Sequence, residues 1–207
     1  MSLPIQLWLV HPEEAMCAAF VKRFADLPDV HVHCKRFEEL PPHDCFVTAG
    51  NAFGIMTAGI DAAVVAFHGE SLMERIQFRI LNDYLGEQPI GTAFVESTGT
   101  PEYPYLVHAP TMRVPGSIDG TDKVYVATWA ALLAVYQHNV TAADKIYSVA
   151  FPAMGTGFGG VSFEEAARQM AAAYHHYCSP PHRLDWDTVV QRHKTIAYEN
   201  GAQVVKH

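Results

Sequence analysis

Hydrophobic residues in this chain form two kinds of pattern, which alternate along its length. Short apolar runs are typical of buried strands, whereas apolar residues that recur every three or four positions are typical of amphipathic helices. The short runs predict strands at residues 5–10, 30–34, 45–49, 91–96, 105–109 and 145–150. The longer patterns predict helices at residues 13–27, 59–67, 72–85, 121–138 and 162–177. This alternation predicts an α/β sheet layered by helices.

The chain has 207 residues, which is the length of one domain, and 49% of them are hydrophobic, enough for a sizeable core. The composition changes in residues 179–207, which begin with Pro180-Pro181 and are more polar than the rest. A helix is expected there at residues 186–198. We therefore expect a domain over residues 1–178 and a helical C-terminal extension over residues 179–207 that packs on it.

Charge and cysteine content argue against several classes of protein. The formal net charge of −8 opposes binding of nucleic acid, which depends on a basic face. The four cysteines stand singly, without a C-x-x-C pair, which is typical of reduced thiols in a cytosolic protein. No apolar run approaches the ~20 residues of a membrane span, and we expect no signal peptide. We expect a cytoplasmic protein that binds neither nucleic acid nor membranes.

A strand end, a glycine loop and a helix start follow one another in residues 151–170. The loop contains Gly155, Gly157, Gly159 and Gly160, which let backbone N–H groups approach a ligand without side chains in the way. Ser162, with Glu165 three residues later, forms the capping-box pattern that opens a helix. A helix N-terminus directs free N–H groups and its positive dipole end at the same place. The segment therefore favours a phosphate or diphosphate ligand.

A second loop of the same kind occurs earlier in the chain. The predicted strand that ends at Ala49 runs into Gly50, Asn51, Gly54 and Gly59, and a helix begins at residue 60 or 61. Two such units can converge at the carboxyl edge of one sheet, which is the usual ligand crevice of open α/β folds. Two loops of this type in a single small domain are stronger support for a ligand site than one.

Two other interpretations of these residues are weaker. Gly155, Gly157 and Gly160 formally satisfy G-x-G-x-x-G, but the acidic residue that a dinucleotide fold needs about 20 residues later is absent until Asp185. A small histidine-rich group near the C-terminal end resembles metal ligands, but no second cluster completes a tetrahedral set. We expect neither a bound metal nor a cofactor. The members of that group are His175, His176, Cys178 and His182.

Several motifs together resemble the macro domain family, which binds ADP-ribose. The resemblance rests on VTAGN at residues 47–51, AGIDAAV at 58–64, LVHAP at 106–110, PAMGTGFG at 152–159 and EEAAR at 164–168. They occur in the family's order and cover about residues 44–177. Residues 51–54, 109–113 and 166–170 also look like a branch of the family described as phage tail-assembly-like.

The resemblance implies a three-layer α/β/α fold with a mixed central sheet. It also implies ADP-ribose or an ADP-ribosylated protein as partner, with the adenosine end of the ligand near the first strand and the two glycine loops around the diphosphate and distal ribose. The ligand-binding residues that it implies are Ala49, Gly50, Gly59, Ile60, Pro152, Gly155, Thr156, Gly157, Phe158 and Gly159.

Asn51 and Asp61 are the candidate catalytic residues. By resemblance, Asn51 hydrogen-bonds the distal ribose, and Asp61 orients a ribose hydroxyl or an attacking water in the hydrolytic branches of the family. A carboxylate beside a water is suited to general-base catalysis. The residues also allow structural roles. Asn51 can form an Asx-turn, and Asp61 can complement the helix dipole from the first turn.

The chain departs from the family pattern at several positions. Thr48 and Gly50 replace family residues, and Gly159 stands where an aromatic side chain is common. Phe158 or Phe53 could take the place of that aromatic. The adenine-contacting Asp is missing after the first strand, and Arg113 could pair with a phosphate or simply be solvated. Three hypotheses follow: a binder of ADP-ribose, a hydrolase of ADP-ribosyl linkages or of a phosphorylated derivative, and a phage-derived assembly protein with a vestigial pocket.

Overall fold

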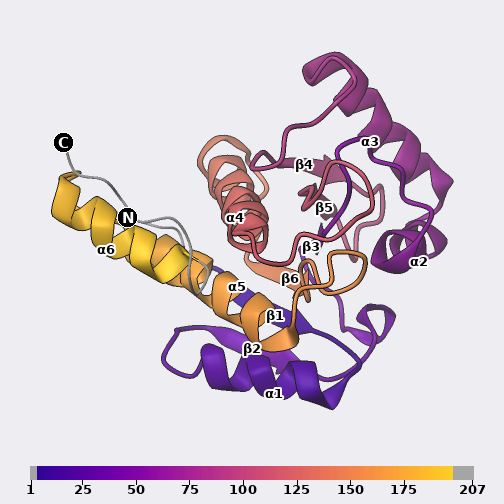
Figure 1. The fold of residues 1–207 in the computed structure, drawn as a ribbon. Helices are drawn as coiled ribbons and strands as arrows, with labels where there is room; N and C mark the ends of the chain where they lie inside the picture. The colour runs from indigo at the N-terminus through magenta and orange to yellow at the C-terminus, as the bar shows by residue number, and fades with distance from the viewer. Residues whose placement is uncertain (1–3, 198–207) are drawn as a thin grey trace.

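A computed structural model describes residues 4–197 and shows one mixed sheet of six strands (Figure 1). The strand order is β2-β1-β6-β3-β5-β4, and every neighbouring pair is parallel except β4 and β5 at one edge. The strands are β1 (Gln6–Val10), β2 (Val30–His33), β3 (Cys45–Thr48), β4 (Phe94–Ser97), β5 (Tyr105–His108) and β6 (Ser148–Pro152).

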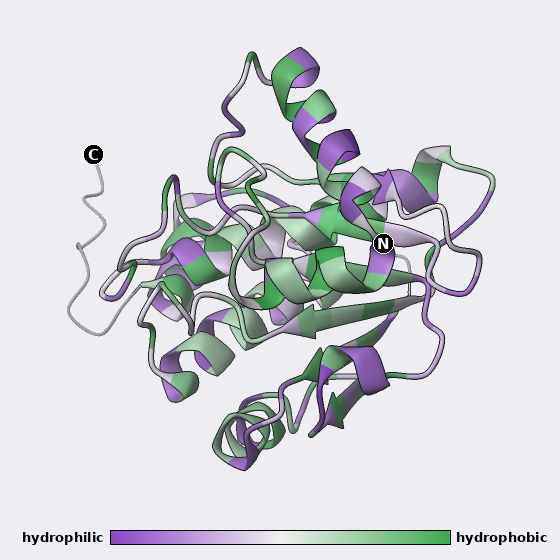
Figure 2. Ribbon diagram, turned by 90° about the vertical axis from the view of Figure 1, so that its right-hand side faces the viewer, coloured by the Kyte–Doolittle hydropathy of each residue, from purple (hydrophilic) through white to green (hydrophobic). Residues whose placement is uncertain are grey.

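Helices cover both faces of this sheet, which confirms the predicted three-layer α/β/α architecture (Figure 1). One face packs against α1 (Glu14–Arg23), α4 (Lys123–Thr141) and α5 (Phe163–Cys178). The other packs against α2 (Gly59–His68), α3 (Glu70–Asp83) and the short helix η1 (Phe37–Glu39). In Figure 2 the helices carry both hydrophilic and hydrophobic residues, while the central strands are mostly hydrophobic.

Strand alternation divides the apolar side chains between the two cores. Leu7 and Leu9 of β1 pack on the side of α1 and α5, whereas Val10 packs with the α2 and α3 side. Since successive side chains of a strand point to opposite faces, a strand covered on both faces must be apolar at nearly every position. All four residues of β3 are buried, as this rule requires. Among residues 4–197 no helix is long and apolar enough to cross a membrane.

The Ser162 N-cap forms as predicted, but the reciprocal half of the capping box does not. The Ser162 hydroxyl accepts a hydrogen bond from the Glu165 N–H at 3.3 Å. The Glu165 carboxylate instead accepts two hydrogen bonds from the Arg168 guanidinium, at 2.6 and 2.7 Å. A bidentate charged pair is stronger than a hydrogen bond to a neutral backbone amide, which explains the preference.

Some boundaries differ from the sequence prediction because turns and caps intervene. β4 begins at Phe94, because Gly91 has a φ of +92° and the Thr92 N–H closes a turn onto the Pro89 carbonyl at 3.2 Å. β6 begins at Ser148, because the Lys145 ammonium donates to two carbonyls at the end of α4. The short helix η1 was not predicted.

A sixth helix, α6 (Trp186–Ile196), follows the double proline and lies along α5 (Figure 1). The Arg168 guanidinium of α5 donates to the Thr195 carbonyl at 2.7 Å, and the Arg192 guanidinium lies 4.6 Å from the centre of the Trp129 ring. The last residue expected in this helix, Tyr198, lies outside the described residues. The division into residues 1–178 and 179–207 stays a prediction.

Candidate functional site

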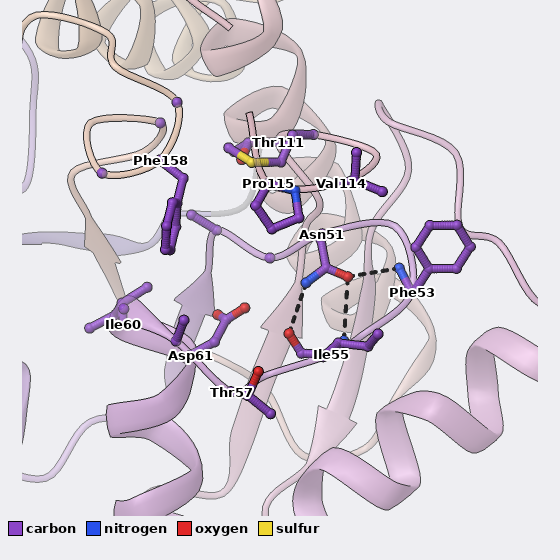
Figure 3. Close-up of a pocket in the computed structure, with 18 of the residues that line it drawn as sticks. Asn51, Phe53, Ile55, Thr57, Ile60, Asp61, Thr111, Val114, Pro115 and Phe158 are labelled. Carbon is purple, nitrogen blue, oxygen red and sulfur yellow. Dashed lines mark hydrogen bonds between the residues drawn. The ribbon is translucent and has the colours of Figure 1, made fainter. Parts of the chain in front are cut away.

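The two glycine loops meet because the strands before them are neighbours. β3 and β6 are adjacent and parallel, so the segments that follow Thr48 and Pro152 leave the same edge of the sheet. Between them lies a cavity of about 220 Å³ (Figure 3). A third segment after β5 closes one side. The residues that line the cavity are Ala49, Gly50, Asn51, Phe53, Ile55, Thr57, Ala58, Gly59, Ile60, Asp61, Thr111, Met112, Val114, Pro115, Ala153, Gly155, Gly157, Phe158 and Gly159.

Two glycines of the second loop are required by close packing. Gly155 has a φ of +75°, and a Cβ atom there would lie 2.7 Å from the Val124 side chain. A Cβ atom on Gly159 would lie 2.3 Å from the Gly155 carbonyl oxygen. By contrast, a Cβ atom on Gly157 would meet nothing within 4 Å. The loop is therefore shaped by Gly155 and Gly159, and Gly157 leaves open space above the cavity.

Residues with free backbone N–H groups line this cavity on both sides. Within residues 4–197, the N–H groups of Gly157, Phe158 and Gly159 have no protein acceptor. The same holds for the first-turn N–H groups of α2, at Gly59 to Asp61, since the N-cap residue of this helix offers no side-chain acceptor. A loop of free amides opposite a helix N-terminus attracts anions without a lysine or arginine.

Asp61 is a buried carboxylate at the floor of the cavity. Its side chain is 6% exposed, and its Oδ1 accepts a hydrogen bond from the Thr48 hydroxyl at the end of β3. Burial raises the Asp61 pKa from 3.8 to about 6, while the Thr48 hydroxyl acts in the opposite direction. Asp61 is thus ionised at neutral pH but more basic than an ordinary carboxylate, which is the property of a general base.

Asn51 braces its own loop in the conformation that the structure shows. Its Oδ1 accepts from the Phe53 N–H at 3.1 Å and the Ile55 N–H at 3.4 Å, and its Nδ2 donates to the Ile55 carbonyl at 2.8 Å (Figure 3). This is the Asx-turn that the sequence allowed as an alternative. The side chain still lines the cavity.

The aromatic residues near the cavity take different positions. The Phe158 side chain is 62% exposed, and Figure 3 shows its ring beside Ile60 at the cavity mouth. The Phe53 ring lies on the other side of the Asn51 turn, with the Arg113 guanidinium 5.6 Å from its centre. Arg113 forms a bidentate ion pair with Glu87 at 2.6 and 2.9 Å and does not line the cavity.

A second cavity of about 380 Å³ adjoins the first. The two cavities share residues Gly59, Ile60, Ala153 and Gly157, and the predicted site residues Pro152 and Thr156 line only the second. The second cavity extends to the ends of the first two strands. The further residues that line it are Val10, His11, Pro12, Lys35, Arg36, Phe37, Glu38 and Ala63.

The structure therefore brings all twelve predicted site residues to one cleft, but it adds residues that the sequence analysis did not name. Val114 and Pro115 come from the segment after β5, and Lys35 and Arg36 come from the segment after β2. Each of them follows the carboxyl end of a parallel strand, which was the available signal. Which of these residues bind a ligand stays a prediction.

Two buried polar groups behind the first loop support its shape. A Cβ atom on Gly50 would lie 2.5 Å from Nε2 of His108, which is fully buried at the end of β5, so only glycine fits there. Nδ1 of His108 lies 2.6 Å from the Gln88 side-chain oxygen. Burial lowers the His108 pKa to about 4, so the ring is neutral. The buried Thr111 hydroxyl has no partner among the described residues and lines the cavity.

The histidine group near the C-terminal end has other contacts. His176 lies 3.1 Å from the Tyr125 hydroxyl through Nδ1 and 3.1 Å from the Thr195 hydroxyl through Nε2. Over residues 4–197, no three histidine, cysteine or acidic side chains are arranged as a metal site. Both ring nitrogens of His176 are therefore used in packing α6 against α4 and α5.

The profile of the Macro domain family matches residues 47–170, which run from the end of β3 through both glycine loops to the middle of α5. This chain belongs to the macro domain family. Among curated relatives of this macro domain are a protein of Aquifex aeolicus, 34% identical over 61% of this chain and 70% of its own length, and a protein of Aeropyrum pernix, 32% identical over 63% and 62%. This chain thus spans less than two thirds of the second relative.

Solved structures confirm the macro domain fold. A variant of the Oceanobacillus iheyensis macrodomain with ADPR has a TM-score of 0.59 at 18% identity, covering 86% of this chain and 83% of that one. The Trypanosoma brucei macrodomain in complex with ADP-ribose has a TM-score of 0.54 at 14% identity, covering 85% and 59%. The macrodomain of Mycobacterium tuberculosis DarG has a TM-score of 0.55 at 20% identity, covering 65% and 83%.

Proposed function

We propose that this macro domain binds ADP-ribose, or a close ADP-ribosyl derivative, in the cleft formed by the two adjoining cavities. The observation that carries the proposal is the pair of free-amide clusters, at residues 157–159 and 59–61, on opposite sides of one cavity. Such backbone donors can hold a diphosphate without cationic side chains, which suits a protein with a net charge of −8. Two similar folds were solved with ADP-ribose, which supports this choice of ligand.

In the proposed complex the diphosphate lies between the two loops. The distal ribose enters the smaller cavity, where the Asp61 carboxylate can bond to its hydroxyl groups. The adenosine part extends into the larger cavity toward the end of β1. The Phe158 ring at the mouth can cover the ribose, since aromatic faces pack well on apolar sugar surfaces.

Hydrolysis of an ADP-ribosyl linkage is a second candidate, which the Asp61 carboxylate favours. In this reaction a water oxygen attacks the anomeric carbon of the distal ribose and Asp61 takes a proton of that water. The bond from the anomeric carbon to the linking atom breaks, and the linking atom leaves with the bonding electron pair and is protonated by solvent where it is too basic to leave as an anion. Asp61 has the burial and the raised pKa for this role. Asn51 is turned onto its own loop, so its part in catalysis would require the side chain to exchange the Ile55 contacts for the ligand.

Calorimetric titration with ADP-ribose tests binding. Heat with saturation in the micromolar to millimolar range supports the proposal, and no heat at millimolar ligand contradicts it and favours an assembly protein with a vestigial pocket. Incubation with an ADP-ribosylated protein separates binder from hydrolase. If Asp61 is the base, Asp61→Asn abolishes release of ADP-ribose and retains binding. Unchanged release in that variant would remove Asp61 from the reaction.

A further inference from the structure

The larger cavity ends in a pair of cationic side chains. Lys35 and Arg36 follow β2 and line this cavity, beside His11, which follows β1. β1 and β2 are adjacent parallel strands, so the segments after them leave the sheet side by side (Figure 1). The other residues of the cavity wall come from the end of β1 and the turn after it, from the end of β6 and the loop after it, from α2 and from η1, which contributes the Glu38 carboxylate. The cations are therefore part of the same cleft as the proposed diphosphate site.

These two charges are weakly neutralised by the protein. Lys35 is partly buried and has no ion-pair partner among the described residues. The Arg36 guanidinium lies 3.8 Å from the Glu38 carboxylate, and its side chain is 70% exposed, so this pair contributes little. A chain with a net charge of −8 has few cations, and placing two together on a cavity wall favours an anionic ligand there.

His11 adds a neutral donor at the same place. Its Nδ1 accepts a hydrogen bond from the Glu13 N–H at 3.2 Å. Nε2 therefore carries the proton of the neutral ring and can donate it to a ligand. A lysine, an arginine and a neutral imidazole N–H together match the oxygen atoms of a phosphate group, each of which accepts several hydrogen bonds.

We infer that the Lys35–Arg36 end of the cleft binds a phosphomonoester on the adenosine ribose of the ligand. The inference rests on the proposed function, in which the adenosine part faces this cavity and backbone amides already hold the diphosphate. Adenine and an unmodified ribose are neutral and need no cations, so the two side chains are left for a third phosphate. The ligand class is an ADP-ribose phosphorylated on the adenosine ribose, as in the ADP-ribose part of NADP⁺, whose 2′-phosphate is commonly held by arginine in other folds.

Calorimetry with ADP-ribose and with ADP-ribose 2′-phosphate tests this inference. We expect the phosphorylated ligand to bind about tenfold more tightly, which corresponds to about 1.4 kcal/mol. Lys35→Ala and Arg36→Ala should each reduce that ratio toward one, because each should weaken binding of the phosphorylated ligand more than binding of ADP-ribose. Lys194→Ala, on the exposed face of α6, removes an equal charge away from the cleft and should keep the ratio.

Competition with inorganic phosphate tests the Lys35–Arg36 site separately from the rest of the cleft. At millimolar concentration it should weaken binding of the 2′-phosphorylated ligand more than binding of ADP-ribose. Equal affinity of the wild-type protein for the two ligands overturns the inference and leaves the proposed function standing. A preference that survives in both cleft variants also overturns it. Absence of binding by both ligands overturns the inference together with the proposed function.

Discussion

Gly157 is the position where a substitution can block the proposed diphosphate site without disturbing the fold. The residue is exposed and lines both cavities, and a Cβ atom there would meet nothing within 4 Å. Its φ lies outside the left-handed region that disfavours other residues, unlike that of Gly155. We therefore expect Gly157→Glu to change the free energy of unfolding by less than about 0.5 kcal/mol, as for other surface substitutions.

The effect on ADP-ribose binding should be large. A carboxylate about 5 Å from a phosphate oxygen is repelled by about 3 kcal/mol at an effective dielectric constant of about 20, and by about 1 kcal/mol if water screens the pair fully. The glutamate side chain also occupies the space between the free amides and the ligand. Together these effects predict a loss of affinity of at least about thirtyfold, which corresponds to about 2 kcal/mol.

Calorimetric titration of three variants separates the effect of the added charge from that of the added side-chain volume. Gly157→Gln has the same size without the charge and should lose less affinity than Gly157→Glu. Gly116→Glu adds the same charge in an exposed loop outside both cavities, where the closest atom to a new Cβ is the Val114 carbonyl oxygen at 3.8 Å. It should bind like the wild type. Wild-type affinity in Gly157→Glu, with its fold intact by circular dichroism, would refute the loop assignment.

Three further predictions concern stability. Asp61→Asn should raise the free energy of unfolding at pH 7.5 by about 1–3 kcal/mol, because an Asp61 pKa of about 6 in the folded protein means that the ionised form is held unfavourably. As the pH rises from 4 to 6, the free energy of unfolding of the wild type should therefore fall relative to that of Asp61→Asn. If the urea midpoints of the two proteins change in parallel with pH, the prediction is wrong. His108 should lower the free energy of unfolding as the pH falls, which is the opposite pH dependence. Its pKa of about 4 in the folded protein lies below the ordinary 6.5, so the unfolded chain takes up the proton first. The wild type should lose about 3 kcal/mol from this residue between pH 6.5 and pH 4, and His108→Gln should lose visibly less over that range. Arg168→Ala removes the hydrogen bonds to the last carbonyls of α6 and should speed amide hydrogen exchange in residues 186–196 while ADP-ribose affinity stays unchanged; equal exchange rates would show that α6 is held by other contacts.

Much of the fold was visible in the sequence because its signals are local. The strand that ends at Thr48, the helix that begins at Gly59 and the Ser162 cap each depend on neighbouring residues, and each appears within two residues of its predicted position. The mostly parallel sheet follows from the alternation of strands and helices. The convergence of the two glycine loops was also accessible, since both follow strands and strand ends share an edge in such sheets.

The features that were missed depend on contacts between distant segments. Lys35 and Arg36 reach the cleft only because β2 pairs with β1, and the alternation pattern gives no order of strands. Arg113 forms an ion pair with Glu87, which lies 26 residues earlier in the chain, so the residues next to Arg113 gave no indication of this partner. The Asn51 side chain hydrogen-bonds its own loop in this structure. That contact depends on the exact loop geometry, which residue types do not specify.

Backbone amide resonances in a ¹H–¹⁵N NMR titration with ADP-ribose test most directly whether free main-chain donors hold the ligand. Formation of hydrogen bonds to the diphosphate should move the amide signals of residues 157–159 and 59–61 more than any others, in a saturable and concerted way. Unchanged signals at these six positions, while amides elsewhere in the protein shift with saturation, would contradict the account.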